Sequence, residues 1–165
     1  MIGDEIHRLA TELWPINRSI TGDGVRLTLE ILKQHLPSLR IYDVPTGTQV
    51  FDWVVPKEWK IKEAWIKDAD GKKIVDYKNS NLSVVNYSSR FSGNLSAEKL
   101  KKKLHYHPYM KTAIPYKTTY YNKDWGFCVS KEIFNKIMSC KKKLKVKIDS
   151  NFKKGNLIYG ELLIK

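Results

Sequence analysis

The sequence has no long hydrophobic run and few cysteines, and each shortage excludes a class of protein. No stretch of its 165 residues approaches the roughly 20 consecutive apolar residues that a transmembrane helix needs. The start, MIGDEIHRLA, is acidic and has no apolar signal-peptide segment, so we expect a cytoplasmic protein. Cys128 and Cys140 form no CxxC pair and are too few for a disulfide framework, so we expect two free thiols.

Arginine is also scarce, although the net charge is +13, because 25 of the 30 basic residues are lysines. Arginine is the better bidentate reader of phosphates and bases, so this excess argues against sequence-specific nucleic-acid recognition. Lysines still attract polyanions through counterion release. We interpret the densest runs, KLKKKL (Lys99–Leu104) and CKKKLKVK (Cys140–Lys147), as solvated faces of elements with an apolar side. The alternative is a non-catalytic basic module that binds an anionic polymer, either polysaccharide or nucleic acid.

Apolar residues at helical spacing predict two helices near the N-terminus. The spacing i, i+4, i+7, i+11 from Ile2 predicts the first, and the proline of LWP ends it. The same spacing after Gly24 predicts the second, which stops at Pro37. We expect Thr21 or Asp23 to cap its first turn.

From Leu39 onward, alternating patterns predict strands. The clearest hairpin joins IKEAWI to KIVDY through an Asp70-Gly71 turn. Further strands are expected at LRIYDV, LSVVNY, LKVKID and NLIYGELLI, with a turn at SNFKKG, and VFDWVVPKEW is expected to be an irregular edge strand. Two more helices are expected, capped by Ser96 and Ser130. This order predicts an α/β fold, read locally as α+β. The apolar final strand indicates that the rest of a sheet is missing or supplied by a partner.

The segment LWPINRSITGDG (Leu13–Gly24) raises the question of a phosphate loop. It lacks GxxxxGK[ST] and GxGxxG, and it follows a helix rather than a strand, so we interpret it as a helix start near Arg18. His105 and His107 have the spacing of a metal pair but no supporting third ligand. Cys128 lies in an apolar run, where an inert thiol is expected. Neither GxSxG nor HExxH occurs, so the residues alone give no catalytic set.

Four segments in register nevertheless resemble one family. They are LWPINRSITGDGVRLTLEIL, VPTGTQVFDWVVPKEW, IPYKTTYYNKDWGFCVS and IDSNFKKGNLIYGELLIK. Together they resemble a bacterial family of zinc aminopeptidase-like proteins, whose members are often found beside genes for surface-polysaccharide biosynthesis. The resemblance covers essentially the whole chain.

The resemblance implies an α/β core related to di-zinc aminopeptidases, with a small β-rich domain inserted early. Residues 1–44 would then be the helices and first strand of the core, 45–142 the inserted domain, and 143–165 strands that return to an incomplete core. In the family, the metal ligands follow the strand that ends here at Leu163–Lys165. No zinc ligand or general base therefore carries over, and none of these residues is expected to hold a metal.

We therefore expect the N-terminal portion of a zinc-dependent aminopeptidase-like hydrolase, from a truncated or split protein that is inactive alone. Zinc would belong to the full-length family rather than to these residues. Partners would be a C-terminal half or a second copy, joined through the terminal strand, and neither a membrane nor a nucleic acid is expected. The residues expected near the substrate are Arg18, Tyr120, Tyr121 and Trp125.

Overall fold

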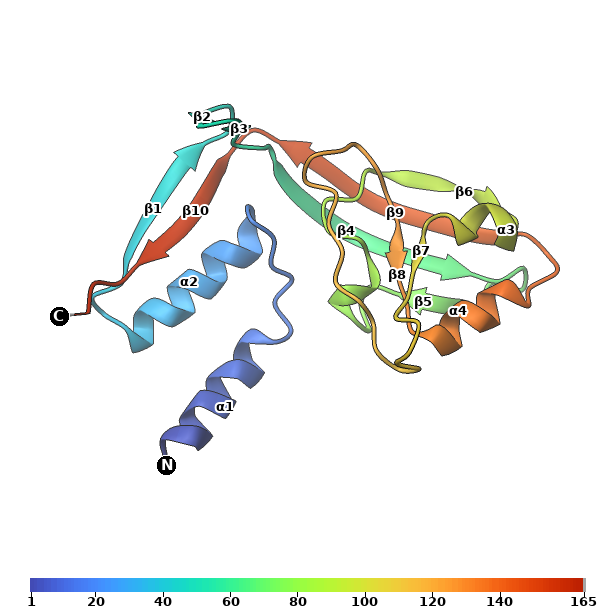
Figure 1. The fold of residues 1–165 in the computed structure, drawn as a ribbon, viewed down its shortest axis with the longest axis horizontal. Coiled ribbons are helices and arrows are strands. Elements are labelled where there is room, and N and C mark those ends of the chain that lie inside the picture. Colours follow the sequence, from blue (N-terminus) through green and yellow to red (C-terminus); the bar gives the residue numbers. More distant parts are fainter. Residues whose placement is uncertain (165) are drawn as a thin grey trace. The chain divides into compact units, whose positions relative to one another are not determined.

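The computed structural model describes residues 1–164, which form two compact units (Figure 1). The first unit comprises Met1–Lys60 and Phe152–Lys165, and the second comprises Ile61–Asn151. The chain enters the second unit within β4 (Glu58–Lys67) and leaves it within β9 (Leu144–Lys153). The division into a core and an inserted domain, expected from the resemblance, remains a prediction.

The first unit contains both N-terminal helices and a two-stranded sheet. Helix α1 (Ile2–Leu13) and helix α2 (Asp23–His35) confirm the two predicted helices. Strand β1 (Arg40–Pro45) pairs antiparallel with β10 (Asn156–Glu161) along its whole length. The segment between β1 and β4 contains only the two-residue strands β2 (Gln49–Val50) and β3 (Trp53–Val54). Helix α1 buries none of its residues, although one of its faces is apolar.

The predicted cap of α2 is wrong. The N-cap residue is Gly22, with φ of 94° and no side-chain cap. Thr21 is buried and forms an isolated bridge with Leu157, while Asp23 is turned to Arg26 and Lys60. Glycine suits this position because its φ disfavours residues with a Cβ, and because a Cβ there would lie 3.1 Å from the carbonyl oxygen of Trp59.

The second unit is built on a four-stranded sheet with the order β5-β4-β9-β6. Strand β5 (Lys73–Asp76) forms the predicted hairpin with β4, and Gly71 in its turn has φ of 87°. Strand β6 (Phe91–Leu95) pairs antiparallel with β9 on the other side. The structure is therefore a small mixed α+β fold with mainly antiparallel sheets, which confirms the local α+β reading of the sequence.

Two short helices cover the apolar face of this sheet. Helix α3 (Ala97–Lys101) and helix α4 (Lys131–Met138) pack together, and the hydroxyls of Ser96 and Ser130 cap them as predicted. Leu100 of α3 is fully buried against the sheet. The apolar core of the unit is Ala64, Ile66, Val75, Val84, Ala97, Leu100, Leu104, Phe127, Val129, Ile137, Leu144, Val146 and Ile148.

Two predicted elements are wrong. LSVVNY forms a 3₁₀ turn, η1 (Asn81–Ser83), followed by single bridges rather than a strand. The SNFKKG turn is shorter than expected, because β9 continues to Lys153.

Strand β7 (Leu104–His105) pairs in parallel with β8 (Phe127–Cys128). Within residues 1–164, every helix is too short or too polar to cross a membrane.

Candidate functional site

The longest irregular segment of the second unit runs over residues 106–126, between β7 and β8, and we call it the aromatic loop. It is fixed by backbone hydrogen bonds: the Asn86 amide donates to Lys117 O at 2.8 Å, and the Ser89 amide donates to Asp124 O at 2.7 Å. Ordered loops of this length within a compact unit commonly carry function. The aromatic loop is therefore the first place to look for a binding surface.

Three tyrosines meet at this loop, and we call them the tyrosine cluster: Tyr87, Tyr116 and Tyr120. The hydroxyls of Tyr116 and Tyr120 lie 2.9 Å apart, and the Tyr120 ring meets the Tyr87 ring edge-on, with centroids 4.9 Å apart. Tyr116 is 59% exposed and the neighbouring Tyr121 is 79% exposed. Rings with a polar hydroxyl bind ligands that present both apolar and hydrogen-bonding groups, such as sugars and peptides.

Tyr87 is the member of the cluster that sequence patterns missed. It is buried, and its φ is 67°, a left-handed conformation that is rare for a residue with a large side chain. No sequence pattern indicates this left-handed conformation, because the segment LSVVNY is predicted to be a strand. Strained backbone of this kind gathers at functional sites, so Tyr87 adds to the case for the aromatic loop.

Trp125, expected near the substrate, is engaged within the second unit. Its ring stacks on Phe91, with centroids 4.0 Å apart, and Lys103 Nζ lies 5.6 Å from the ring centre. Lys103 also pairs with Asp124, and this hydrogen bond holds the pKa of the Asp124 carboxyl below its usual value. Trp125 thus anchors one end of the aromatic loop, and its role toward a substrate remains a prediction.

Arg18, the fourth residue expected near the substrate, belongs to the first unit. Its Nη1 donates to Leu13 O at 2.6 Å, at the end of α1. Arg18 therefore binds a backbone carbonyl at the C-terminal end of α1. Tyr120, Tyr121 and Trp125, by contrast, all belong to the aromatic loop of the second unit. The four residues remain predicted as substrate-adjacent.

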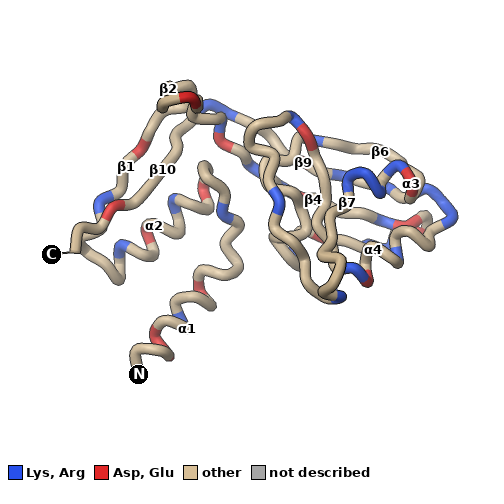
Figure 2. Tube along the Cα trace, in the orientation of Figure 1, with Lys and Arg blue, Asp and Glu red and all other residues tan. Residues whose placement is uncertain are grey.

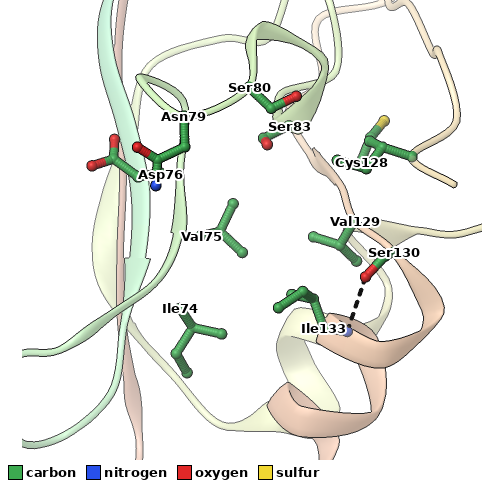
Figure 3. Close-up of a pocket in the computed structure, with 11 residues that line it drawn as sticks. Ile74, Val75, Asp76, Asn79, Ser80, Ser83, Cys128, Val129, Ser130 and Ile133 are labelled. Atoms are coloured by element: carbon green, nitrogen blue, oxygen red, sulfur yellow. Dashed lines mark hydrogen bonds between the residues drawn. The ribbon is translucent and has the colours of Figure 1, made fainter. Parts of the chain in front are cut away.

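A pocket of about 170 Å³ opens beside the same loop (Figure 3). Its floor is apolar, formed by Ile74 and Val75 of β5, Val129, and Ile133 of α4, and serines and Asn79 lie around it. Cys128 lines one side, and burial raises the pKa of its thiol to about 11. The thiol stays protonated at neutral pH, so Cys128 is unsuited to nucleophilic attack.

The histidines do not form a metal centre. Burial, followed by the charge of Lys117, lowers the pKa of His105. The Nδ1 of His107 accepts the backbone N–H groups of Tyr109 and Met110, at 3.3 and 3.1 Å. Over residues 1–164 there is no group of three His, Cys, Asp or Glu side chains that could hold a metal ion. These residues do not fit a zinc centre, and we derive no catalytic step through zinc.

The first unit contains a polar centre around Glu58, which is 1% exposed. Its Oε1 accepts hydrogen bonds from Arg26 and from the Asn156 amide, the latter at 3.0 Å, and its Oε2 lies 3.5 Å from Lys153 Nζ. Burial acts to raise the pKa of the Glu58 carboxyl, but these bonds outweigh it and the pKa is lowered. The Glu58 centre joins α2, β4 and β10 of the first unit and was not predicted.

The Glu58 centre also explains LWPINRSITGDG. Arg26, on the first turn of α2, donates to Glu58, and the loop before α2 folds back so that Gly24 lies against the backbone of Asn17. A Cβ on Gly24 would overlap the carbonyl oxygen of Asn17, which only glycine avoids. Gly155 lies equally close to the Glu58 side chain, because a Cβ added at this position would overlap the Glu58 carboxylate. The segment is therefore a structural element that positions α2 against Glu58.

Comparisons with known proteins agree with the resemblance. The family model described as "Domain of unknown function (DUF2172)" matches residues 58–151, more than half of the chain. A Clostridium acetobutylicum protein named "Putative polysaccharide biosynthesis protein with aminopeptidase-like domain" is 45% identical over 163 residues, which cover 99% of this chain and 37% of that protein.

A solved structure shows the same relation. The "Crystal structure of putative peptidase from Clostridium acetobutylicum" matches with a TM-score of 0.89 and 45% identity, over 96% of this chain and 37% of that one. The chain thus spans 37% of the length of these relatives, corresponding to their N-terminal part. The resemblance to an aminopeptidase-like family associated with polysaccharide biosynthesis is confirmed.

Proposed function

The chain belongs to the family described as a domain of unknown function, DUF2172, and we propose that it forms the N-terminal, non-catalytic region of a zinc-dependent aminopeptidase-like hydrolase. The observation that carries the proposal is the 45% identity, at a TM-score of 0.89, to a protein whose title calls it a "putative peptidase". The metal ligands and the general base of that hydrolase would come from polypeptide other than residues 1–164. Bound zinc would supply an activated water for amide hydrolysis.

The apolar surface of the first unit supports this role. In α1, Ile2 is 77% exposed and Ile6 is 63% exposed, although they form the apolar stripe of an amphipathic helix. Leu163 and Ile164, after β10, are 76% and 84% exposed. In proteins, an amphipathic helix gains most of its stability from packing its apolar face against other elements. The exposed apolar surface of α1 and of Leu163 and Ile164 therefore favours contact with another polypeptide. We propose that a polypeptide related to the rest of the Clostridium protein supplies this contact and extends the two-stranded sheet toward an α/β core.

The second unit would then act as an accessory domain. The aromatic loop offers Tyr116, Tyr120 and Tyr121 as contacts for a peptide or for a sugar chain. The name of the Clostridium protein favours a pathway of surface-polysaccharide biosynthesis for the whole hydrolase. A cytoplasmic location, which the two free thiols favour, belongs to the same proposal.

A chimaera tests the proposed function. Residues 1–165 replace the matching N-terminal 37% of the Clostridium protein, and three samples are compared: parent, chimaera and the 165-residue chain alone. We expect the chimaera to keep the zinc content of the parent and its hydrolysis of aminoacyl p-nitroanilides, and the chain alone to have neither. Metal content is measured by elemental analysis and hydrolysis by absorbance.

Two results would overturn the proposal. One is stoichiometric zinc and aminoacyl hydrolysis by the 165-residue chain itself, which would place the chemistry in this region. The other is a folded chimaera without activity beside an active parent. If the folded, zinc-loaded parent hydrolyses no aminoacyl substrate, the peptidase reaction class is wrong for both proteins.

A further inference from the structure

The two lysine-rich runs of the sequence meet at one end of the sheet in the second unit. Leu95, the last residue of β6, pairs with Leu144, the first residue of β9. Helix α3 begins directly after β6, and the 139–143 turn leads directly into β9. Because α3 also packs against α4, both runs lie together at this end, where Figure 2 shows basic residues gathered on α3 and on the turn before β9.

Seven lysines make up this surface, which we call the lysine end: Lys99, Lys101, Lys102, Lys141, Lys142, Lys143 and Lys145. All seven are exposed, and none takes part in the ion pairs of residues 1–164. By contrast, three other lysines of the unit have carboxylate partners: Lys73 pairs with Asp76, Lys103 with Asp124, and Lys147 with Glu63. The lysine end is therefore a surface of uncompensated positive charge.

The surrounding sequence adds almost no negative charge. Within residues 96–102 and 139–145, Glu98 is the only acid, so seven lysines and one glutamate give a local charge of +6. The apolar residues of the same runs, such as Leu100 and Val146, are buried in the core and hold the backbone in place. Like charges held together repel each other, and a polyanion relieves this repulsion while releasing its own counterions.

The residue types favour one kind of polyanion. Neither segment contains an arginine or an aromatic ring, so the lysine end lacks bidentate base contacts and stacking platforms, on which nucleic-acid binding commonly relies. Lysine ammonium groups are flexible point charges that tolerate any register of carboxylates along a chain. We infer that the lysine end is a docking surface for an acidic polysaccharide with a carboxylate on its repeating sugar. The choice of polysaccharide rests on the proposed function.

Polymer binding by the 165-residue chain tests this inference. The probe is polygalacturonate, with neutral dextran and oligo(dT) as comparators, and affinity is measured by calorimetry from 50 to 300 mM NaCl. The test variant is Lys101→Gln/Lys142→Gln/Lys143→Gln. The matched control, Lys72→Gln/Lys78→Gln/Lys123→Gln, removes the same charge from exposed lysines of the same unit.

We expect polygalacturonate to bind and dextran not to bind. The test variant should lose about tenfold or more in affinity at 50 mM NaCl, and the slope of log K against log salt should fall by roughly 2, because about 0.7 is lost per neutralised contact. The control should change affinity less than about threefold. Circular dichroism confirms that both variants fold.

Three results would overturn the inference. No binding at 50 mM NaCl would make the lysine end a solvated surface. Equal losses of affinity in both variants would show that net charge, rather than the lysine end, causes binding. Tighter binding of oligo(dT) than of polygalacturonate would indicate a nucleic acid as the partner. The assay involves neither metal nor hydrolysis, so these failures are distinct from failure of the chimaera.

Discussion

The two units of this chain are stabilised in different ways. The second unit buries a continuous core of thirteen apolar residues. In the described part of the first unit, the buried apolar residues are Leu39, Val55 and Trp59, beside the buried carboxylate of Glu58. The second unit therefore has the interior of an independently folding domain. The first unit depends on a polar centre and leaves the apolar face of α1 exposed, which supports its proposed role as part of a larger core.

The largest expected effect lies in the core of the second unit. Phe127→Ala should lower its free energy of unfolding by about 3–5 kcal/mol, because it removes a fully buried ring and leaves a cavity. Urea unfolding measures the loss. Tyr109→Ala, at a 90% exposed ring, is the control and should have little effect. Similar losses in the two variants would contradict the assigned core.

Arg26→Ala should have the largest effect in the first unit, about 3 kcal/mol, because it leaves the Glu58 carboxylate buried without its main partner. Hydrogen exchange of α2 amides reports the change locally. The control is Arg90→Ala, which removes an exposed pair with Asp149 and should change stability by less than about 1 kcal/mol. Faster exchange throughout the second unit as well would show that the two units unfold together.

Acid should weaken the first unit through Glu58. The folded-state pKa of this carboxyl lies below 4.5, its ordinary value, so its contribution to stability is complete above pH 4.5 and is lost as pH falls through the folded-state pKa. The protection factors of the α2 amides, which compare exchange with the intrinsic rate at each pH, should therefore fall below about pH 4.5. Glu58→Gln should remove this part of the pH dependence, and an unchanged pH profile would assign it to other carboxyls.

A smaller effect is expected at the cap of α4. Ser130→Ala removes the hydroxyl that accepts the Ile133 amide at 3.2 Å, and should destabilise the second unit by about 1 kcal/mol. The urea midpoint measures this change. Ser130→Asp, which restores an acceptor, should recover most of the loss, whereas a loss as large as that of alanine would point to packing rather than capping.

The smallest effect on stability is expected at the exposed stripe of α1. Ile6→Glu should change the free energy of unfolding by less than about 0.5 kcal/mol, because this side chain is mostly exposed. It should nevertheless reduce self-association of the 165-residue chain, measured by sedimentation at increasing concentration. If the parent chain is a clean monomer at all concentrations, a second copy is not the cover of this face.

Local patterns predicted much of this fold. The helices α1 and α2, the Ser96 and Ser130 caps and the Asp70-Gly71 hairpin follow from spacing and turn chemistry that act over a few residues. The strand expected at LSVVNY failed because the segment begins in the 3₁₀ turn η1 and ends at Tyr87, whose backbone is left-handed. The cap of α2 failed because Thr21 is buried in a bridge to Leu157, more than a hundred residues away in sequence.

The sites were less predictable than the elements. The Glu58 centre joins residues from α2, β4 and β10, which are far apart in sequence, so no local sequence pattern predicts it. Both lysine runs were visible, but only the pairing of Leu95 with Leu144 brings them to one end of a sheet. Tyr120 and Tyr121 were selected through the family resemblance, and the contact of Tyr120 with Tyr87 required the structure.

The path of the chain through β4 and β9 has an evolutionary consequence. These strands are neighbours in one sheet, so the second unit begins and ends on adjacent strands. A domain with its two ends side by side can be gained, lost or exchanged between proteins without altering the path of the host chain. Residues 61–151 therefore have the geometry of an exchangeable domain, and a related protein without them would join the chain at residue 60 to the chain at residue 152 by a short turn.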